Sequence, residues 1–342
     1  MKTSLFDYHL PPKLIANSPV NPRDHSRLMV INKKNNTISH KHFFDIVDYL
    51  DKNDVLVLNQ TKVFPARIFG KKESGGKVEL LLTKAIGEFA WEVLAKPGLK
   101  VGAKIILNDF TGTVIQRDEE IHTIEFSLNR IALLNNLNQT GVTPLPPYIK
   151  NEESESELRT KYQTIYAKEI GSVAAPTAGF HFTEELLEKI KSKGVQIEYV
   201  TLHVGLGTFM PVKTENLEDH TMHSEDFFVE QEVIIRLNNA KKNGKRIVAV
   251  GSTSTRVLES IASGNTINST NMFISGETNL FIYPPYKFKF VDVMITNFHL
   301  PKSTLMAMVY AFGGTELMKL AYKEAIKEKY RFYSFGDSMM IY

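Results

Sequence analysis

The sequence predicts an α/β protein with a discontinuous α/β main domain and a small β-barrel domain inserted into it. Residues 66–128 consist of short strand-like runs separated by Gly-containing breaks, and this close, regular spacing is typical of a small barrel or sandwich. On either side, apolar strand-like runs alternate with helix-like runs, which is typical of a sheet covered by helices. We therefore expect the main domain to comprise residues 1–64 and 150–342, and the inserted barrel to comprise residues 65–149.

Two apolar runs near the start of the chain, LMVIN and DVLVLN, predict strands of the main domain. The insert contributes six short runs: ARIFG, GKVELLLT, AWEVLAK, KIILN, TGTVIQ and HTIEFSL. A brief helix is expected at about 128–138, ending toward Gly141, before the proline-stiffened TPLPPYI. The acidic stretch NEESESE that follows predicts a solvated loop.

The remainder of the chain has the pattern of an α/β sheet. Thr183 can cap a helix whose apolar stripe contains Leu186, Leu187 and Ile190, and Gly194 ends that helix. The run RIVAVG predicts a strand buried on both faces, because it shows no alternation of apolar and polar residues. Further strands and helices are predicted by VQIEYVTLHV, residues 230–243, STSTRVLESIASG, VDVMIT and STLMAMVYAFGG.

Composition excludes several classes of protein. The chain has 342 residues, of which 43% are apolar and 23% charged, and this is ordinary globular composition. It has no run of about 18 apolar residues that would form a transmembrane helix, and its first residues lack the pattern of a secretory signal, so we expect a cytoplasmic protein. The chain has no cysteine, which excludes thiolate nucleophiles, cysteine zinc sites and cysteine-bound iron–sulfur clusters.

Positive charge is concentrated in residues 62–104, which include the first part of the predicted insert. The whole chain has a net charge of +3, but residues 62–104 hold nine Lys and Arg against four Glu, so this window carries +5 and the rest of the chain −2. A local positive field can hold a phosphate backbone, and the candidate contacts are Arg67, Lys71, Lys72 and Lys77. The alternative is a soluble β-domain with lysines on its outer faces, and charge alone favours that alternative.

The segment AAPTAGFHFT (174–183) combines small residues with the start of a helix. Pro176, Thr177 and Gly179 would let a ligand approach the backbone closely. The helix that follows offers free N–H groups and the positive end of its dipole to an anion or carboxylate. The alternative is a well-packed loop in which hydrogen bonds hold His181.

The segment GSTSTR (251–256) follows a predicted parallel strand and opens a helix, which is where open α/β sheets bind ligands. Ser252, Thr253 and Ser254 can hydrogen-bond a hydroxyl, amine or phosphate. Arg256 can bind a carboxylate or phosphate in a fork. The alternative is simple helix capping, which needs only one of these hydroxyls.

The segment NFHLPKST (297–304) repeats this arrangement after another predicted strand. Asn297 and His299 follow the strand, and Ser303 can cap the next helix. Two such loops in one sheet favour a shared ligand crevice at the strand ends.

The usual nucleotide-binding fingerprints are absent, since the chain contains neither G-x-x-x-x-G-K-[ST] nor G-x-G-x-x-G. The segment HVGLGTF (203–209) follows a predicted strand but has only two glycines. Its Gly205, Gly207 and Thr208 are candidate ligand contacts, and the alternative is a tight turn.

Two further segments have competing interpretations. In HTMHSE, His220, His223 and Glu225 carry metal-binding groups, but adjacent loop histidines are more often hydrogen-bonded polar groups, so no metal is expected. In the C-terminal RFYSFGDSMMIY, aromatic faces could hold a cation, with Asp337 adding charge complementarity. The favoured alternative is a C-terminal strand that docks its phenylalanines, Phe332 and Phe335, into the core.

Ten motifs lie in one order along residues 4–342, and together they resemble the S-adenosylmethionine:tRNA ribosyltransferase-isomerases of queuosine biosynthesis. The combination of GSVAAPTAGFHFT with ITNFHLPKSTL is the most specific part of this resemblance. The other motifs are PxNPRDHSRL, LNQTKVFPARIFG, GGKVELLL, PLPPYI, YQTIYA, VTLHVGLGTFMPV, HTMHSE and YRFYSFGDSM.

The resemblance implies a reaction and its participants. S-adenosylmethionine would donate its ribosyl moiety to 7-aminomethyl-7-deazaguanine at the wobble position of tRNA, giving epoxyqueuosine with release of adenine and methionine. It also implies a monomer with no metal and no cofactor beyond S-adenosylmethionine, and tRNA as the partner of the basic insert. The chain departs from the family's usual residues at Gln60, Lys62 and Asn279, so the roles of these positions stay open.

Such a reaction needs groups that move protons near neutral pH, and histidine is the natural choice. Four histidines lie in motif loops: His181, His203, His223 and His299. We expect His181 to be the base, because a helix N-terminus disfavours the imidazolium form. Glu225 would orient a histidine or face the sulfonium of the substrate. The alternative is that these histidines only hydrogen-bond substrate hydroxyls.

Two other functions compete with this one. The chain could be a non-catalytic RNA-binding protein, but polar loops at strand ends are unnecessary for a pure binder. It could be an ordinary S-adenosylmethionine-dependent methyltransferase, which should show a Gly-rich loop after its first strand and an acidic residue ending the second. The sequence shows neither feature convincingly.

Overall fold

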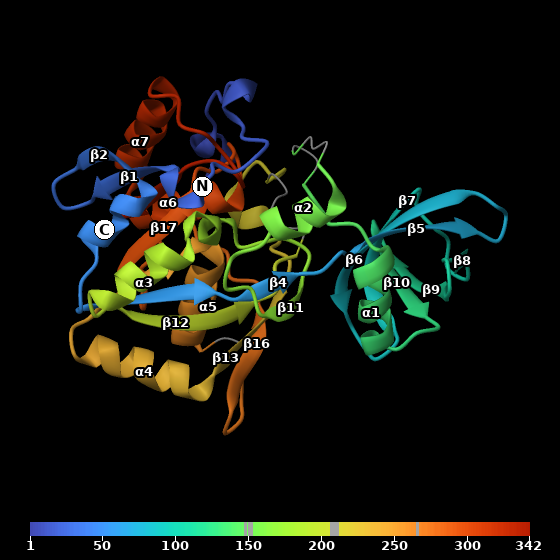
Figure 1. The fold of residues 1–342 in the computed structure, drawn as a ribbon. Coiled ribbons are helices and arrows are strands. Elements are labelled where there is room, and N and C mark those ends of the chain that lie inside the picture. Colours follow the sequence, from blue (N-terminus) through green and yellow to red (C-terminus); the bar gives the residue numbers. More distant parts are fainter. Residues whose placement is uncertain (147–148, 150–152, 206–211, 265–266) are drawn as a thin grey trace.

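The structure is a computed structural model that describes residues 1–342 apart from 147–148, 150–152, 206–211 and 265–266. Figure 1 shows a large α/β domain and a small barrel that stands to one side of it. The chain enters the barrel after β4 (Thr61–Val63) and leaves it after α1 (Arg130–Thr140). This arrangement confirms the predicted fold class, whereas the residue boundaries of the two domains stay predictions.

A ten-stranded sheet forms the centre of the α/β domain. Its strands, in spatial order, are β15 (Ile267–Ser269), β16 (Phe273–Thr278), β13 (Glu225–Glu230), β12 (Gln196–Leu202), β3 (Asp54–Asn59), β14 (Arg246–Val250), β17 (Val293–Asn297), β18 (Ser338–Ile341), β1 (Arg27–Asn32) and β2 (Thr37–His42). The neighbouring strands β12, β3, β14 and β17 all run parallel. Their carboxyl ends therefore meet at one edge of the sheet, where open α/β sheets bind ligands.

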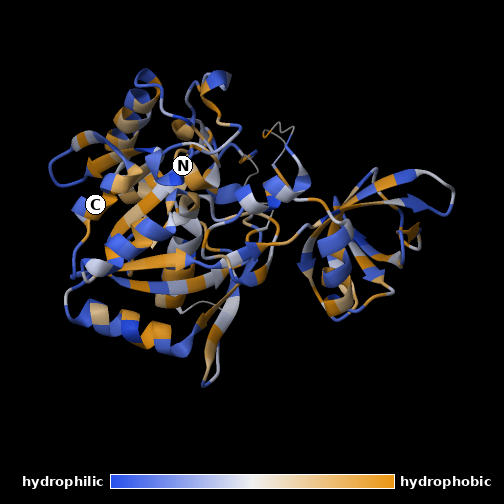
Figure 2. Ribbon diagram, in the orientation of Figure 1, coloured by the Kyte–Doolittle hydropathy of each residue, from blue (hydrophilic) through white to orange (hydrophobic). Residues whose placement is uncertain are grey.

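Helices cover both faces of this sheet. One face carries η4 (Phe43–Tyr49) and α3 (Glu184–Ser192), and the other carries α4 (Gln231–Lys242), α5 (Gly251–Ser263), α6 (Thr304–Gly313) and α7 (Thr315–Lys327). Strand β3 is buried on both faces, with Val55 and Val57 toward α4–α7 and Leu56 and Leu58 toward α3. Figure 2 shows the same division, with apolar central strands beneath helices that carry polar residues. None of the helices in the described residues is long and apolar enough to cross a membrane.

Short elements complete the α/β domain. Strand β11 (Glu169–Ser172) pairs in parallel with β4 as a separate two-stranded sheet. The short 3-10 helices are η1 (Thr3–Phe6), η2 (Pro12–Leu14), η3 (Arg23–His25), η5 (Thr177–His181) and η7 (Leu217–Asp219).

The insert is a closed barrel with a hydrophobic core of its own. Its strands, in order around the barrel, are β10 (Ile121–Phe126), β7 (Ala90–Lys96), β6 (Lys77–Ala85), β5 (Arg67–Lys72), β8 (Lys104–Ile106) and β9 (Thr111–Asp118). Helix α1 adds Leu133 and Leu137 to the barrel core. The two ends of the insert lie side by side, because Arg67 N donates to Val142 O at 3.1 Å and Val142 N donates to Arg67 O at 2.8 Å.

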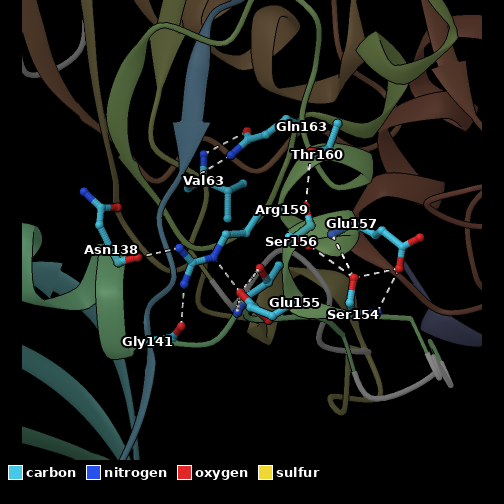
Figure 3. A network of polar contacts seen from close by, with 11 residues as sticks. Val63, Asn138, Gly141, Ser154, Glu155, Ser156, Glu157, Arg159, Thr160 and Gln163 are labelled. Atoms are coloured by element: carbon cyan, nitrogen blue, oxygen red, sulfur yellow. Dashed lines mark hydrogen bonds and ion pairs between the residues drawn. The ribbon is translucent and has the colours of Figure 1, made fainter.

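One predicted element is wrong. The stretch NEESESE was expected to be a solvated loop, but helix α2 (Glu155–Lys161) begins inside it. Ser154 Oγ accepts a hydrogen bond from Glu157 N at 3.4 Å, and Glu157 Oε2 accepts one from Ser154 N at 3.0 Å (Figure 3). This reciprocal pair is a capping box, which stabilises the start of a helix although the segment is acidic. The six predicted runs of the insert, by contrast, are confirmed as β5–β10, and RIVAVG is confirmed as β14.

Candidate active site

A pocket opens at the carboxyl ends of β14 and β17, which are hydrogen-bonded parallel neighbours. Its wall comes from residues 175–178, 251–253 and 296–301, together with Val204, Ser303, Leu305, Tyr333 and Ser334. Gly251 makes the turn from β14 into α5 with a φ of +85°, a conformation that favours glycine. The two strand-end loops therefore line one pocket, as the sequence predicted.

Seven of the predicted site residues line this pocket: Pro176, Thr177, Ser252, Thr253, Asn297, His299 and Ser303. Ser303 also caps α6, because its Oγ accepts a hydrogen bond from Met306 N at 3.1 Å. Thr253 Oγ1 is buried and has no hydrogen-bond partner among the described residues. A buried hydroxyl without a partner is rare in folded proteins, so Thr253 offers the pocket's clearest polar contact for a ligand.

His299 lines the pocket from the loop that follows β17. Its Nε2 lies 2.9 Å from Thr296 Oγ1, and its backbone is held by the hydroxyls of Tyr8 and Tyr322. Burial lowers the pKa of His299 to about 3. The imidazole is therefore neutral at physiological pH and has a ring nitrogen that can accept a proton.

His181, which we expected to be the base, lies behind the pocket wall instead of in it. Its Nδ1 is 2.7 Å from Ser26 Oγ, its Nε2 is 3.3 Å from Asn297 Nδ2, and its ring stacks on Phe43. Burial lowers the pKa of His181 to about 3. His181 therefore contacts the pocket residue Asn297 from behind, whereas His299 lines the pocket itself.

The two buried histidines should make the protein sensitive to acid. Each has a folded-state pKa of about 3, below the value of 6.5 expected when unfolded, so the unfolded state binds more protons in acid. The contribution of these neutral histidines to the free energy of unfolding should be fully present above about pH 6.5. It should fall toward pH 3, by at most about 1.4 kcal/mol per pH unit for each histidine. Denaturant unfolding of His181→Gln between pH 4 and 7 should show a shallower slope. His42→Gln, which changes an exposed histidine, is the matched control and should keep the parent slope.

Arg256 is on α5, as predicted, but it is not part of the pocket lining. We expected its guanidinium to bind a substrate carboxylate, but it forms a buried ion pair with Glu225, and their side chains are 3% and 4% exposed. It also donates to Thr278 O at 2.9 Å and to Leu280 O at 3.2 Å. Glu225 accepts a further hydrogen bond from Gly205 N at 2.8 Å, next to the pocket residue Val204. The ion pair therefore supports the pocket wall at Val204 through the hydrogen bond from Gly205.

Other candidates among the small residues serve packing. A Cβ on Gly179 would lie 2.1 Å from the hydroxyl of Tyr166. The group that approaches the Gly179 backbone closely is therefore this tyrosine. Ser254 is fully buried and is not part of the pocket lining. Gly207 and Thr208 lie outside the described residues.

The two remaining catalytic candidates also lie outside the pocket. His203 Nδ1 is 2.9 Å from Thr61 Oγ1, and an added Cβ on Gly171 would touch its ring at 2.6 Å, so this histidine faces the β4–β11 sheet. Burial lowers the pKa of His203 to about 4. His223 is exposed, in the segment before β13.

Asp337 accepts hydrogen bonds from backbone donors and is not part of the pocket lining. It is 1% exposed and accepts hydrogen bonds from Arg27 N at 2.9 Å and Arg331 N at 2.7 Å. Burial raises the pKa of Asp337. Phe332 and Phe335 are buried, which confirms the favoured alternative of a docked C-terminal segment that leads into β18.

The predicted RNA contacts lie on the β5–β6 hairpin of the barrel. Lys71 and Lys77 are exposed and face each other in the strand register, and Lys72 is half-buried beside them. Arg67 forms an ion pair with Glu79 at the other end of β5, so its charge is partly neutralised.

Sequence reasoning missed three residues that shape the site. Ser26 holds His181, Thr296 holds His299, and the carbonyl of Tyr333 accepts a hydrogen bond from Asn297 Nδ2 at 3.1 Å. Ser26 and Tyr333 belong to motifs that carry the family resemblance, so the motifs themselves were the available signal.

The three positions that depart from the family pattern lie outside the pocket. Gln60 Nε2 donates to Thr201 Oγ1 at 3.4 Å, and Lys62 and Asn279 are exposed. In the part of the chain that the structure describes, no three His, Asp or Glu side chains are placed to hold a metal ion.

A pocket at the carboxyl ends of parallel strands, with polar side chains and the neutral His299 in its wall, is typical of an α/β enzyme. The chain belongs to the queuosine biosynthesis protein family, since residues 3–341 match it. It is 52% identical to the S-adenosylmethionine:tRNA ribosyltransferase-isomerase of Thermosipho melanesiensis and 51% identical to that of Acetivibrio thermocellus, each over 100% of both chains. The crystal structure of S-adenosylmethionine tRNA ribosyltransferase from Thermotoga maritima is similar over 99% of this chain and 100% of that one, with 37% identity and a TM-score of 0.58.

Proposed function

We propose that this chain transfers the ribosyl moiety of S-adenosylmethionine to 7-aminomethyl-7-deazaguanine at the tRNA wobble position and isomerises it, which gives epoxyqueuosine-tRNA, adenine and methionine. The observation that carries this function is the identity of 52% over the full length of a relative that bears this activity as its name. The pocket and the lysine-rich β5–β6 hairpin of the separate barrel supply the two kinds of surface that such a reaction needs. We further propose a cytoplasmic monomer that uses no metal and no additional cofactor.

The reaction requires three proton movements. The aminomethyl nitrogen is mostly protonated at neutral pH and must lose a proton before it can attack. A second proton leaves the carbon beside the sulfonium, whose positive charge acidifies it, and adenine departs more easily when it is protonated. A positioned side chain accelerates such steps, and His299 is the histidine that both lines the pocket and remains neutral there.

We assign the polar ends of S-adenosylmethionine to the two strand-end loops. The start of α5 offers backbone N–H groups together with Ser252 and the unpartnered Thr253 hydroxyl, which suit a carboxylate or ribose hydroxyls. Asn297 and Ser303 lie on the opposite loop. Arg256 has no place in this assignment, because its donors are already engaged by Glu225 and two backbone carbonyls.

One incubation tests the function against its competitors. The protein is mixed with S-adenosylmethionine and tRNA that carries 7-aminomethyl-7-deazaguanine, and the small-molecule products are separated. Release of adenine and methionine in equal amounts is the expected result. S-adenosylhomocysteine would indicate a methyltransferase instead, and tRNA binding without turnover would indicate a pure RNA-binding protein.

Reversing charge on the β5–β6 hairpin should weaken tRNA binding. Lys71, Lys72 and Lys77 changed together to Glu should lower tRNA affinity and flatten its dependence on salt, because fewer phosphates are neutralised. The matched control changes Lys319, Lys323 and Lys327, which are exposed on α7 of the α/β domain. Salt titrations of binding measure both triple variants. Equal losses of affinity, or none in the hairpin variant, would mean that the hairpin does not contact the RNA.

A further inference from the structure

Helix α2 lies where the barrel joins the α/β domain, between the segment that enters the barrel and the segment that returns from it (Figure 1, Figure 3). Gln163, just beyond this helix, pairs with the entering segment. Its Oε1 accepts a hydrogen bond from Val63 N at 3.1 Å, and its Nε2 donates to Val63 O at 2.7 Å. A side-chain amide that satisfies both backbone groups of one residue holds that residue in a fixed position.

Arg159 of α2 holds the returning segment. Its guanidinium donates to Asn138 O at 2.5 Å and to Gly141 O at 2.6 Å, which are carbonyls at the end of barrel helix α1 (Figure 3). A cation at a helix C-terminus is favourable, because the last carbonyls there lack helical partners. Arg159 thus joins α2 to the barrel by charge-assisted hydrogen bonds, which are stronger than neutral ones.

Glu155 orients the Arg159 side chain and also binds Thr143, in the segment that returns from the barrel. Its Oε1 accepts hydrogen bonds from Arg159 Nε at 2.8 Å, from Thr143 N at 2.9 Å and from Thr143 Oγ1 at 2.7 Å. Both side chains are 33% exposed, so solvent partly screens the attraction between their charges.

The carboxyl end of α2 is also tied to the loop behind the candidate active site. Arg23 donates to the carbonyls at the end of α2, namely Gln163 O at 2.6 Å and Thr160 O and Lys161 O at 3.1 Å each. The Arg23 guanidinium lies over the ring of Phe180, the neighbour of His181. Three residues further on, Ser26 Oγ contacts His181 Nδ1. Contacts of α2 therefore reach both the barrel and, through Arg23 and the short stretch of chain to Ser26, the loop behind the pocket.

We propose that Arg159 and Glu155 are positioning residues that fix the barrel at one orientation relative to the pocket, so that RNA held on the barrel presents its base to the site. This inference rests on the proposed function for the identity of the RNA. The barrel core also packs on Val173 of the α/β domain, and partly exposed Lys84 forms ion pairs with Asp226 and Glu277, so the barrel keeps other contacts when those of α2 are lost. Loss of the α2 contacts should therefore loosen the orientation of the barrel without unfolding either domain.

The test separates orientation from stability. The chain has no cysteine, so a single pair of spin labels can be placed on exposed sites through Lys100→Cys on the barrel and Lys189→Cys on α3. Arg159→Met removes the charge but keeps much of the side-chain stem. The matched control is Arg236→Met, which breaks an ion pair with Glu198 in the α/β domain, far from α2 along the chain.

We expect Arg159→Met to broaden the distance distribution between the labels and to raise the KM for tRNA by about tenfold, equivalent to about 1.4 kcal/mol. The KM for S-adenosylmethionine and the thermal midpoint of each domain should stay near those of Arg236→Met. Glu155→Gln should give a smaller change in the same direction, because the amide oxygen can still accept from Thr143.

An unchanged distance distribution in Arg159→Met, or equal rises in both KM values, would overturn the inference. Parent protein that releases neither adenine nor methionine would overturn the proposed function instead, while the distance measurement would still decide the role of α2.

Discussion

Replacing His299 with alanine is expected to lower turnover by about 100- to 10,000-fold, the usual cost of losing a general acid or base. Among the histidines of the motif loops, only His299 lines the pocket, and Thr296 together with two tyrosine hydroxyls fixes its position. Binding of S-adenosylmethionine should change much less than turnover, because the candidate contacts of Ser252 and Thr253 remain. Single-turnover rates and equilibrium binding measure the two quantities separately.

Two further variants test whether the loss of turnover is specific to His299. His181→Ala removes a buried histidine that reaches the pocket only through Asn297, so it should reduce turnover less than His299→Ala and should also reduce stability. His42→Ala removes an exposed histidine on β2 and should leave turnover unchanged. If His299→Ala keeps turnover within a few-fold of the parent while His181→Ala loses it, the assignment must be reversed.

Arg256→Met is expected to destabilise the protein by about 3–5 kcal/mol, because it leaves the Glu225 carboxylate buried without its cation. The same change should move Gly205, whose N–H donates to that carboxylate, and thereby disturb the pocket wall at Val204. Urea unfolding with a fitted free energy measures the loss of stability.

The double variant Glu225→Gln, Arg256→Met should recover much of that stability, since a neutral amide can be buried at lower cost than an unpaired charge. Lys319→Met, which breaks an exposed ion pair on α7, should change the free energy of unfolding by less than about 1 kcal/mol. A loss in Arg256→Met no larger than that of Lys319→Met would show that the pair is not buried in solution. A specific rise in the requirement for S-adenosylmethionine at unchanged stability would restore Arg256 as a substrate contact.

The sequence predicted the architecture well because periodicity and turn residues report local structure directly. RIVAVG has no alternation, and β14 is buried between two parallel neighbours. The error at α2 arose because the charge of NEESESE was weighed above its capping residues. The spacing of Ser154 and Glu157 is that of a capping box, so the helix start was readable from the sequence.

The site was predicted less completely, because side-chain direction is decided by tertiary packing. The sequence identified both strand-end loops that line the pocket, and the structure brings them together. It gave no means to tell that His181 turns toward Ser26, which is 155 positions away, while His299 lines the pocket. It also could not show that Arg256 meets Glu225 on β13, because that pairing depends on how α5 packs across the sheet.

The backbone pairing of Arg67 with Val142 means that the barrel begins and ends at a single point on the α/β domain. Closing a gap between two adjacent ends costs little entropy, since the cost grows only with the logarithm of loop length. A few glycine and serine residues in place of the barrel would therefore complete the α/β domain as an independent module. Such a module would keep the pocket and lose the barrel with its lysine-rich β5–β6 hairpin, so the two parts of the chain can be produced and studied separately.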